Sequence, residues 1–286
     1  AGNGDGFLTE FDPSGRSLRF STHFGGSGTD ACRGIALEAS ESLYATGSTN
    51  STDLPVSKPL QGTLAGGTDA FVVRIRLEAA DITACTYLGG SADDAGYAVA
   101  VDALGTVCVV GETASADLTV WKAVQSTFGG GSSDAFAARL DMRRPRLLYS
   151  TFLGGAGNDA ARGIAIQPSG VVCVAGETDS LDYPTLNPVQ GSRAGYVDCF
   201  LTRLTQAPAE LADEVVLGLG TYPGSGGWFE YRTDGTQGNV HLDWGSLAAA
   251  AYNAVNGETR IACGDLDGDR LSEVVVGYGT YPADGG

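Results

Sequence analysis

The stretch LGGSADDAGYAVAVDALGTVCVVGETASADLT, residues 88–119, decides the fold because both of its ends recur elsewhere in the chain. Its first seven residues return at spacings of 64 and 65 residues, and its last eleven return in the same phase. The copies are FGGSGTD at 24–30, LGGAGND at 153–159, ATGSTNSTDLP at 45–55 and VAGETDSLDYP at 174–184. Repetition at a fixed period predicts structural units that stack on one another.

A third landmark has the same period. It reads TDAFVVRI at 68–75, SDAFAARL at 133–140 and VDCFLTRL at 197–204, and an earlier copy is GDGFLTEF at 4–11. Three landmarks that share one period indicate a true internal repeat.

Four strands are predicted in each unit. In the second full unit they are YAVAVDA (97–103), TVCVVGE (106–112), DAFAARLD (134–141) and RLLYSTFLG (146–154). Each segment alternates with a period near two or forms a short apolar run, and turn residues bound it. Tandem four-stranded antiparallel sheets are the blades of a β-propeller. We therefore predict an all-β fold, either a β-propeller or an arc of one.

Residues 1–205 resemble a known family. The unit STFLGGAGNDAARGIAIQPSGVVCVAGETDSLDYP, at 150–184, resembles the bacterial β-propeller repeat called SBBP. That repeat occurs mostly in large secreted or surface proteins and has no common catalytic activity. The resemblance therefore implies a scaffold.

The pattern changes at QAPAE, residues 206–210. DEVVLGLGTYPGSGG (213–227) returns as SEVVVGYGTYPADGG (272–286), with a period of 59 residues. This region, residues 206–286, resembles the FG-GAP repeats of integrin-type propellers, whose blades carry a calcium loop between two strands. The chain begins and ends in the middle of a repeat. Two explanations stay open: either the terminal strands complete one shared blade, or the chain is a piece of a longer protein.

The segment CGDLDGDRLSEVVVG at 263–277 is the candidate metal site. Alternate acidic residues in a tight turn converge on one point, and Ca²⁺ takes about six to eight oxygen ligands. The expected ligands are Asp265, Asp267, Asp269, the backbone carbonyl of Leu271, and Glu273. An EF-hand does not fit, because its twelfth position is the apolar Val276. Arg270 and Glu273 depart from the usual FG-GAP loop, and an acidic turn without metal is the alternative.

The preceding FG-GAP-like unit has Gln206, Pro208, Glu210 and Glu214 at the ligand positions. This set lacks alternating aspartates, so we predict one calcium site and not two.

Aspartates recur in every SBBP-like unit. They follow the Gly-Gly turn, follow the second strand, or precede the third strand. The three sets are Asp30, Asp94 and Asp159; Asp53, Asp117 and Asp182; and Asp5, Asp69, Asp134 and Asp198. Aspartate commonly accepts hydrogen bonds from turn amides, which predicts a capping role. A ring of carboxylates that binds cations is the alternative.

The composition is acidic and rich in glycine. The 286 residues include 43 glycines, the formal net charge is −17 and the isoelectric point is about 4.3. Nucleic acids and anionic membranes are therefore poor partners. An extracellular medium suits this charge. The first residue is Ala1, which fits a processed N-terminus or a fragment.

Cysteine and histidine positions do not indicate a redox or nucleophilic site. The six cysteines form no C-x-x-C motif, and Cys108 and Cys173 occupy the repeat position of Tyr44. We therefore predict free thiols in packing positions. His23 aligns with Tyr87 and Phe152 and is predicted to be an aromatic-sized strand residue.

These features together predict a non-enzymatic extracellular or cell-surface scaffold for adhesion, attachment or assembly, with structural Ca²⁺. Its expected partners are other proteins or cell-surface components. The alternative is a glycan-binding lectin, and a polysaccharide-active enzyme ranks third. The lectin interpretation depends on a group of aromatic residues that could stack on sugar rings. Packing of these residues in the blade core is the preferred interpretation. They are Trp228, Phe229, Tyr231, Trp244, Tyr222 and Tyr281.

Overall fold

The computed structural model describes residues 2, 4–38, 42–167 and 169–205 together with five later strand backbones, at 215–220, 228–233, 236–241, 260–264 and 273–279. The chain divides into two compact units, Ala1–Thr205 and Gln206–Gly286. Every regular element in these described residues is a strand, which confirms the all-β prediction. Over the same residues, no helix is long and apolar enough to cross a membrane.

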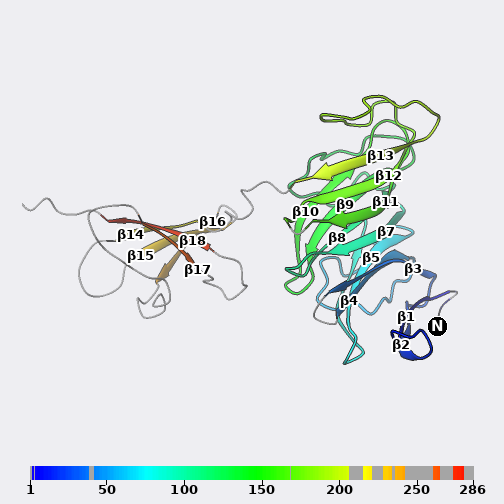
Figure 1. Cartoon of the computed structure of the whole chain (residues 1–286), viewed down its shortest axis with the longest axis horizontal. Helices are drawn as coiled ribbons and strands as arrows, with labels where there is room; N and C mark the ends of the chain where they lie inside the picture. The colour runs from blue at the N-terminus through cyan, green and yellow to red at the C-terminus, as the bar shows by residue number, and fades with distance from the viewer. Residues whose placement is uncertain are drawn as a thin grey trace, which may run out of the picture. The chain divides into compact units, whose positions relative to one another are not determined.

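The described part of the first unit consists of antiparallel sheets whose strands pair in chain order (Figure 1). The hairpin is β1 (Gly6–Phe11) and β2 (Leu18–Phe24). Sheet A is β3 (Asp30–Glu38), β4 (Ser42–Thr49), β5 (Asp69–Arg76) and β6 (Asp81–Leu88). Sheet B is β7 (Asp94–Val101), β8 (Thr106–Thr113), β9 (Asp134–Asp141) and β10 (Arg146–Leu153). Sheet C is β11 (Asp159–Ile166), β12 (Val172–Thr178) and β13 (Asp198–Leu204).

The four strands predicted for the second unit are confirmed as sheet B. The first of them begins at Asp94 instead of residue 97, because the ladder between β7 and β8 extends to the pair Asp94 and Thr113. β-Branched and small residues fill these strands and fit a pleated surface that is buried on both faces.

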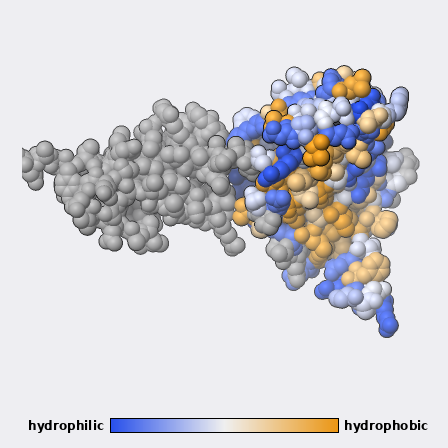
Figure 2. Space-filling view, turned by 45° about the horizontal axis from the view of Figure 1, so that its top comes forward, coloured by the Kyte–Doolittle hydropathy of each residue, from blue (hydrophilic) through white to orange (hydrophobic). Residues whose placement is uncertain are grey.

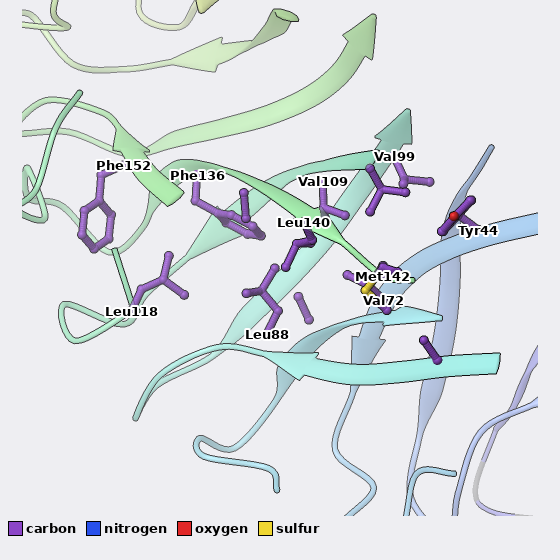
Figure 3. Close-up of a cluster of buried hydrophobic side chains, with 14 residues drawn as sticks. Tyr44, Val72, Leu88, Val99, Val109, Leu118, Phe136, Leu140, Met142 and Phe152 are labelled. Atoms are coloured by element: carbon purple, nitrogen blue, oxygen red, sulfur yellow. The ribbon is translucent and has the colours of Figure 1, made fainter. Parts of the chain in front are cut away.

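Successive sheets pack face to face, with β7 against β3 and β4, and β11 against β7 and β8. Figure 1 shows the sheets following one another from the hairpin to β13. Val72 and Leu88 of sheet A share one buried cluster with Val109, Phe136 and Leu140 of sheet B (Figure 3). Phe136 is fully buried, and each such side chain contributes about 1.5–3 kcal/mol to stability. The apolar core of this unit therefore lies between its sheets.

The described part of the second unit forms one five-stranded sheet, in the order β16-β15-β14-β18-β17. Its strands are β14 (Val215–Gly220), β15 (Trp228–Thr233), β16 (Thr236–His241), β17 (Arg260–Gly264) and β18 (Glu273–Gly279). β14 and β18 pair in parallel, with Val215 opposite Val274, so the two copies of the 59-residue repeat lie in register. This unit therefore differs from the predicted four-stranded antiparallel blades. A parallel pair needs a long connection between its strands, and the chain between β14 and β18 supplies it.

Candidate functional site

The predicted calcium loop falls largely outside the described residues. This holds for Asp265, Asp267, Asp269 and Leu271, whereas Glu273 is described only as a backbone position of β18. β17 and β18 pair antiparallel, with Gly264 opposite Glu273, so the predicted ligands belong to the connection between two paired strands. The counterpart positions Gln206, Pro208, Glu210 and Glu214 also lie outside the described residues.

The aromatic residues that a lectin would use stay a prediction too. Trp228, Phe229 and Tyr231 belong to β15, of which the structure describes the backbone. Tyr222, Trp244 and Tyr281 lie outside the described residues.

The recurring aspartates of the first unit connect one sheet to the next. At the junction of sheets A and B, Oδ2 of Asp94 accepts hydrogen bonds from the Gly90 amide at 2.7 Å and the Ser115 hydroxyl at 2.8 Å. Oδ1 of Asp117 accepts from the amide of Ser91 at 2.9 Å. The same bonds recur at the other junctions, around Asp30 and Asp53 and around Asp159 and Asp182. The predicted capping role is therefore confirmed for these aspartates.

Backbone hydrogen bonds reinforce each junction. The amide of Asp94 donates to the carbonyl of Thr68 at 2.7 Å, and the amide of Asp159 donates to the carbonyl of Ser133 at 2.9 Å. In both cases the first residue of a sheet donates to the residue just before the third strand of the preceding sheet. The Gly-Gly turn that connects the two sheets is therefore held by hydrogen bonds to both of them.

Two buried carboxyl groups meet at the junction of sheets A and B, and two more meet at the junction of sheets B and C. A Cβ atom on Gly89 would lie 2.6 Å from Oδ2 of Asp94 and 2.7 Å from Cγ of Asp69. Burial raises the pKa of both carboxyl groups, and the charge on Asp69 contributes to the effect at Asp94. Like charges in a low-dielectric site oppose ionisation of both groups. These carboxyl groups therefore form a turn-holding pair, and the first glycine of the turn gives them room.

Asp134, which pairs with Asp159 across Gly154, is the least satisfied of these carboxyl groups. Its counterpart Asp69 accepts hydrogen bonds from the amides of Ala65 and Gly66 and from the side chain of Gln61. Asp134 accepts one from the amide of Gly129 through Oδ2, and its Oδ1 is buried without a hydrogen-bond partner. Oδ1 of Asp94 and of Asp159 is unpartnered as well, but each of these carboxyl groups accepts two hydrogen bonds through Oδ2.

The sequence explains this difference. The turn before Asp134 reads FGGGSSD, one residue longer than LAGGTD before Asp69, so it presents its amides differently. Burial, with the charge of Asp159 as a smaller cause, raises the pKa of Asp134 to about 6.

A second repeated feature is a row of bulged residues on the first strands of the three larger sheets. The register shifts at Arg33 in β3, at Tyr97 in β7 and at Arg162 in β11. The guanidinium carbon of Arg162 lies 4.0 Å from the centroid of the Tyr97 ring, and that of Arg33 lies 5.2 Å from it. A bulge re-aims its side chain, and here the three side chains form a ladder across the sheets.

Partners on the second strands extend this row. The hydroxyl of Tyr97 donates to Glu112 at 2.5 Å, and Arg162 donates to Glu177 at 2.6 and 2.9 Å. A groove of about 280 Å³ opens beside them. It is lined by Glu112, Ser133, Asn158, Asp159, Ala160, Arg162, Glu177, Asp179 and Val197. Charged and amide groups dominate this lining, so the groove suits polar contacts.

Reasoning from the sequence missed this row. Arg33, Tyr97 and Arg162 occupy one repeat position, but the residue there is arginine in two units and tyrosine in the third. A position that varies while its neighbours repeat was the signal that the sequence offered.

Across the residues whose side chains are described, no group of three or more His, Cys, Asp or Glu is arranged to hold a metal ion.

The five cysteines of the first unit are free thiols: Cys32, Cys85, Cys108, Cys173 and Cys199. Cys85 and Cys108 are buried, which confirms the predicted packing role, and burial raises the pKa of Cys85 to about 12. Cys199 is exposed, so a buried position was a wrong prediction for this residue. His23 pairs with Phe7 as Tyr87 pairs with Phe71, but it is exposed on the hairpin.

No family model matches the chain, and no curated protein matches it. The interpretation of the two repeat types therefore depends on the motifs and the architecture described above.

Proposed function

We propose that the protein is a non-enzymatic scaffold, extracellular or on the cell surface, that serves adhesion, attachment or assembly. Its first unit would be a set of SBBP-like propeller blades, and its second unit would carry an FG-GAP-like calcium loop at residues 265–273.

The observation that carries this proposal is the repeated junction. The recurring carboxyl and hydroxyl groups are engaged in holding the turn: Oδ2 of Asp94 accepts from the amide of Gly90 and from the hydroxyl of Ser115. The same network occurs at each described Gly-Gly turn. A catalytic site would distinguish one unit from the others, whereas a scaffold needs the same joint in each unit.

The arrangement of the strands supports the propeller. Sheets A and B each contain four antiparallel strands in chain order, and their first strands β3 and β7 lie side by side. Blades pack face to face in this way, with the first strand of each blade innermost. Each blade covers the apolar face of its neighbour.

The proposed calcium site would stiffen one connection of the second unit. The antiparallel pairing of β17 and β18 fits a loop of this type, which lies between two strands. The net charge of −17 fits a cation-rich medium outside the cell.

The test combines three measurements on the full chain. A scaffold is expected to form a stable assembly, to show no saturable turnover of polysaccharides and to bind no member of a glycan array. Turnover that one carboxylate substitution abolishes would replace the scaffold with an enzyme. Glycan binding that is lost in Trp228→Ala would replace it with a lectin.

A further inference from the structure

Each junction of the first unit contains a phenylalanine that packs on the preceding sheet. Phe71, Phe136 and Phe200 occupy one position of the repeat and are 0%, 0% and 6% exposed. The corresponding residue of the hairpin is Phe7, which is 71% exposed. We call this repeat position the knob position. Of its members, Phe7 is the one that no described sheet covers.

The surface that receives each knob also recurs. Leu8 lies in one buried cluster with Phe71, Val72 lies in another with Phe136, and Ala137 lies in the third with Phe200. Leu8, Val72 and Ala137 share one repeat position, the socket position, and are all buried. The fourth member of this series is Leu201 of sheet C, and it is 81% exposed.

Neighbouring residues enlarge both open surfaces. Phe11 and Leu18 are more than half exposed on the hairpin, although their counterparts Ile75 and Ile82 pack in the junction before sheet A. Cys199, two residues before Leu201, is exposed as well. The hairpin and β13 lie at opposite ends of the first unit in Figure 1, and Figure 2 shows apolar patches on its surface. One end thus presents a knob surface and the other a socket surface.

We propose that a second copy of this chain binds head to tail, with its knob surface (Phe7, Phe11 and Leu18) on the socket surface (Cys199 and Leu201) of the first copy. The contact continues the interface that already joins the hairpin to sheet A, sheet A to B, and sheet B to C. Two different surfaces meet, so the interface is heterologous, and each copy can bind one partner at each end.

This inference deepens the proposed scaffold function, because it names the partner in the assembly. It rests on that proposal for its biological role alone, since the contact itself follows from the packing of the first unit. Exposed apolar patches of this kind mark interaction surfaces. The net charge of −17 on each copy opposes association, so screening by salt is expected to strengthen the contact.

The test is sedimentation velocity of the full chain over a range of protein and salt concentrations. The wild type is expected to form dimers and larger species as concentration rises, and more of them at higher salt. Phe7→Asp blocks the knob surface and Leu201→Asp blocks the socket surface, so each variant alone is expected to be monomeric. Both residues are exposed, and circular dichroism of each variant checks that the fold is kept.

Mixing the two variants gives the decisive result. Each retains the surface that the other lacks, so an equimolar mixture is expected to form a one-to-one dimer and nothing larger. The control Val124→Asp changes an equally exposed apolar residue (79%) in the connection between β8 and β9 and is expected to associate like the wild type. A monomeric wild type, or a mixture that stays monomeric, would overturn the proposal. Association combined with enzymatic turnover would overturn the scaffold function and leave the head-to-tail contact intact.

Discussion

The guanidinium carbon of Arg162 lies 4.0 Å from the ring centroid of Tyr97, although the two residues belong to different sheets. They are equivalent positions of the repeat, and both sit at a β-bulge. The stacking of the sheets therefore brings the same position of successive units into contact. When the residue type at such a position changes from one unit to the next, unlike side chains therefore come into contact.

Replacement of Tyr97 tests this ladder. Tyr97→Leu removes the ring between Arg33 and Arg162 and the hydroxyl that donates to Glu112, and is expected to lower the free energy of unfolding by about 2 kcal/mol, because both cation–π contacts and this hydrogen bond are lost at a half-exposed site. A double-mutant cycle with Arg162→Gln, measured by urea unfolding, isolates the pairwise part. Strict additivity of the two substitutions would show that the contact contributes nothing.

Gly89→Ala tests the space between the buried carboxyl groups. The new Cβ would lie 2.6 Å from Oδ2 of Asp94, and we expect a loss of about 1–3 kcal/mol in unfolding free energy from overpacking. In the control Gly62→Ala, the nearest atom is Cγ of Pro59 at 3.7 Å, an ordinary contact. Equal stability of the two variants would contradict this account of the Gly-Gly turn.

Asp134 is expected to make stability depend on pH. Its pKa is raised from 3.8 to about 6 in the folded state, so the native protein binds this proton more tightly than the unfolded chain. Stability therefore falls as pH rises from about 4 to about 6 and stays lower above that range. Asp134→Asn removes this titration, so its stability relative to the wild type should rise over the same range by up to about 3 kcal/mol.

The matched control is Asp69→Asn. Asp69 accepts hydrogen bonds from Gln61 and Ala65 through Oδ2 and from Gly66 through Oδ1, and asparagine keeps only one of these two acceptor oxygens. Because burial also raises the pKa of Asp69, loss of the charge favours this variant and loss of the hydrogen bonds opposes it, so we expect Asp69→Asn to gain less stability at pH 7 than Asp134→Asn, measured by urea unfolding. If Asp134→Asn is instead less stable than the wild type at pH 7, the unpartnered Oδ1 of Asp134 does not lower the unfolding free energy of the wild type.

The ion pair between Arg139 and Asp102 is expected to matter more than those on the surface. Their side chains are 5% and 7% exposed, and Nη2 of Arg139 lies 2.5 Å from Oδ2 of Asp102. Asp102→Asn leaves a buried guanidinium without this charge partner and is expected to cost about 3–5 kcal/mol in thermal or urea unfolding. Asp81→Asn breaks the exposed pair with Arg76 and should cost much less, because solvent screens a surface ion pair.

Calcium binding is tested by calorimetric titration of the full chain. We expect one site in the wild type and none in Asp267→Ala, because a central carboxylate ligand is lost. Glu214→Ala, at the counterpart segment of the sequence that lacks alternating aspartates, should bind like the wild type. Absence of heat at millimolar Ca²⁺ in the wild type would make the loop an acidic turn.

Much of the first unit could be predicted from its repeats. The strands of sheet B follow from alternation and turn residues, and β8, β9 and β10 match the predicted ranges within one residue. The capping role of Asp94 and its equivalents follows from recurrence, because a residue needed at every turn is present in every unit. Both predictions concern local structure, which neighbouring residues along the chain largely fix.

Exposure could not be predicted in this way. Phe7 and Phe71 share a repeat position, yet one is 71% exposed and the other is fully buried, since a preceding sheet covers only the second. The orphaned oxygen of Asp134 is a similar case, because one extra residue in a glycine turn changes which amides face it.

The sequence by itself therefore determined the period, the strands and the turn chemistry of this protein, because these depend on residue types at short spacings. Only the tertiary structure decided which equivalent residues meet, as in the ladder of Arg33, Tyr97 and Arg162. It also decided that β14 and β18 pair in parallel. Contacts of this kind depend on how separate sheets and distant strands pack, and the spacing of residues along the chain does not specify that packing.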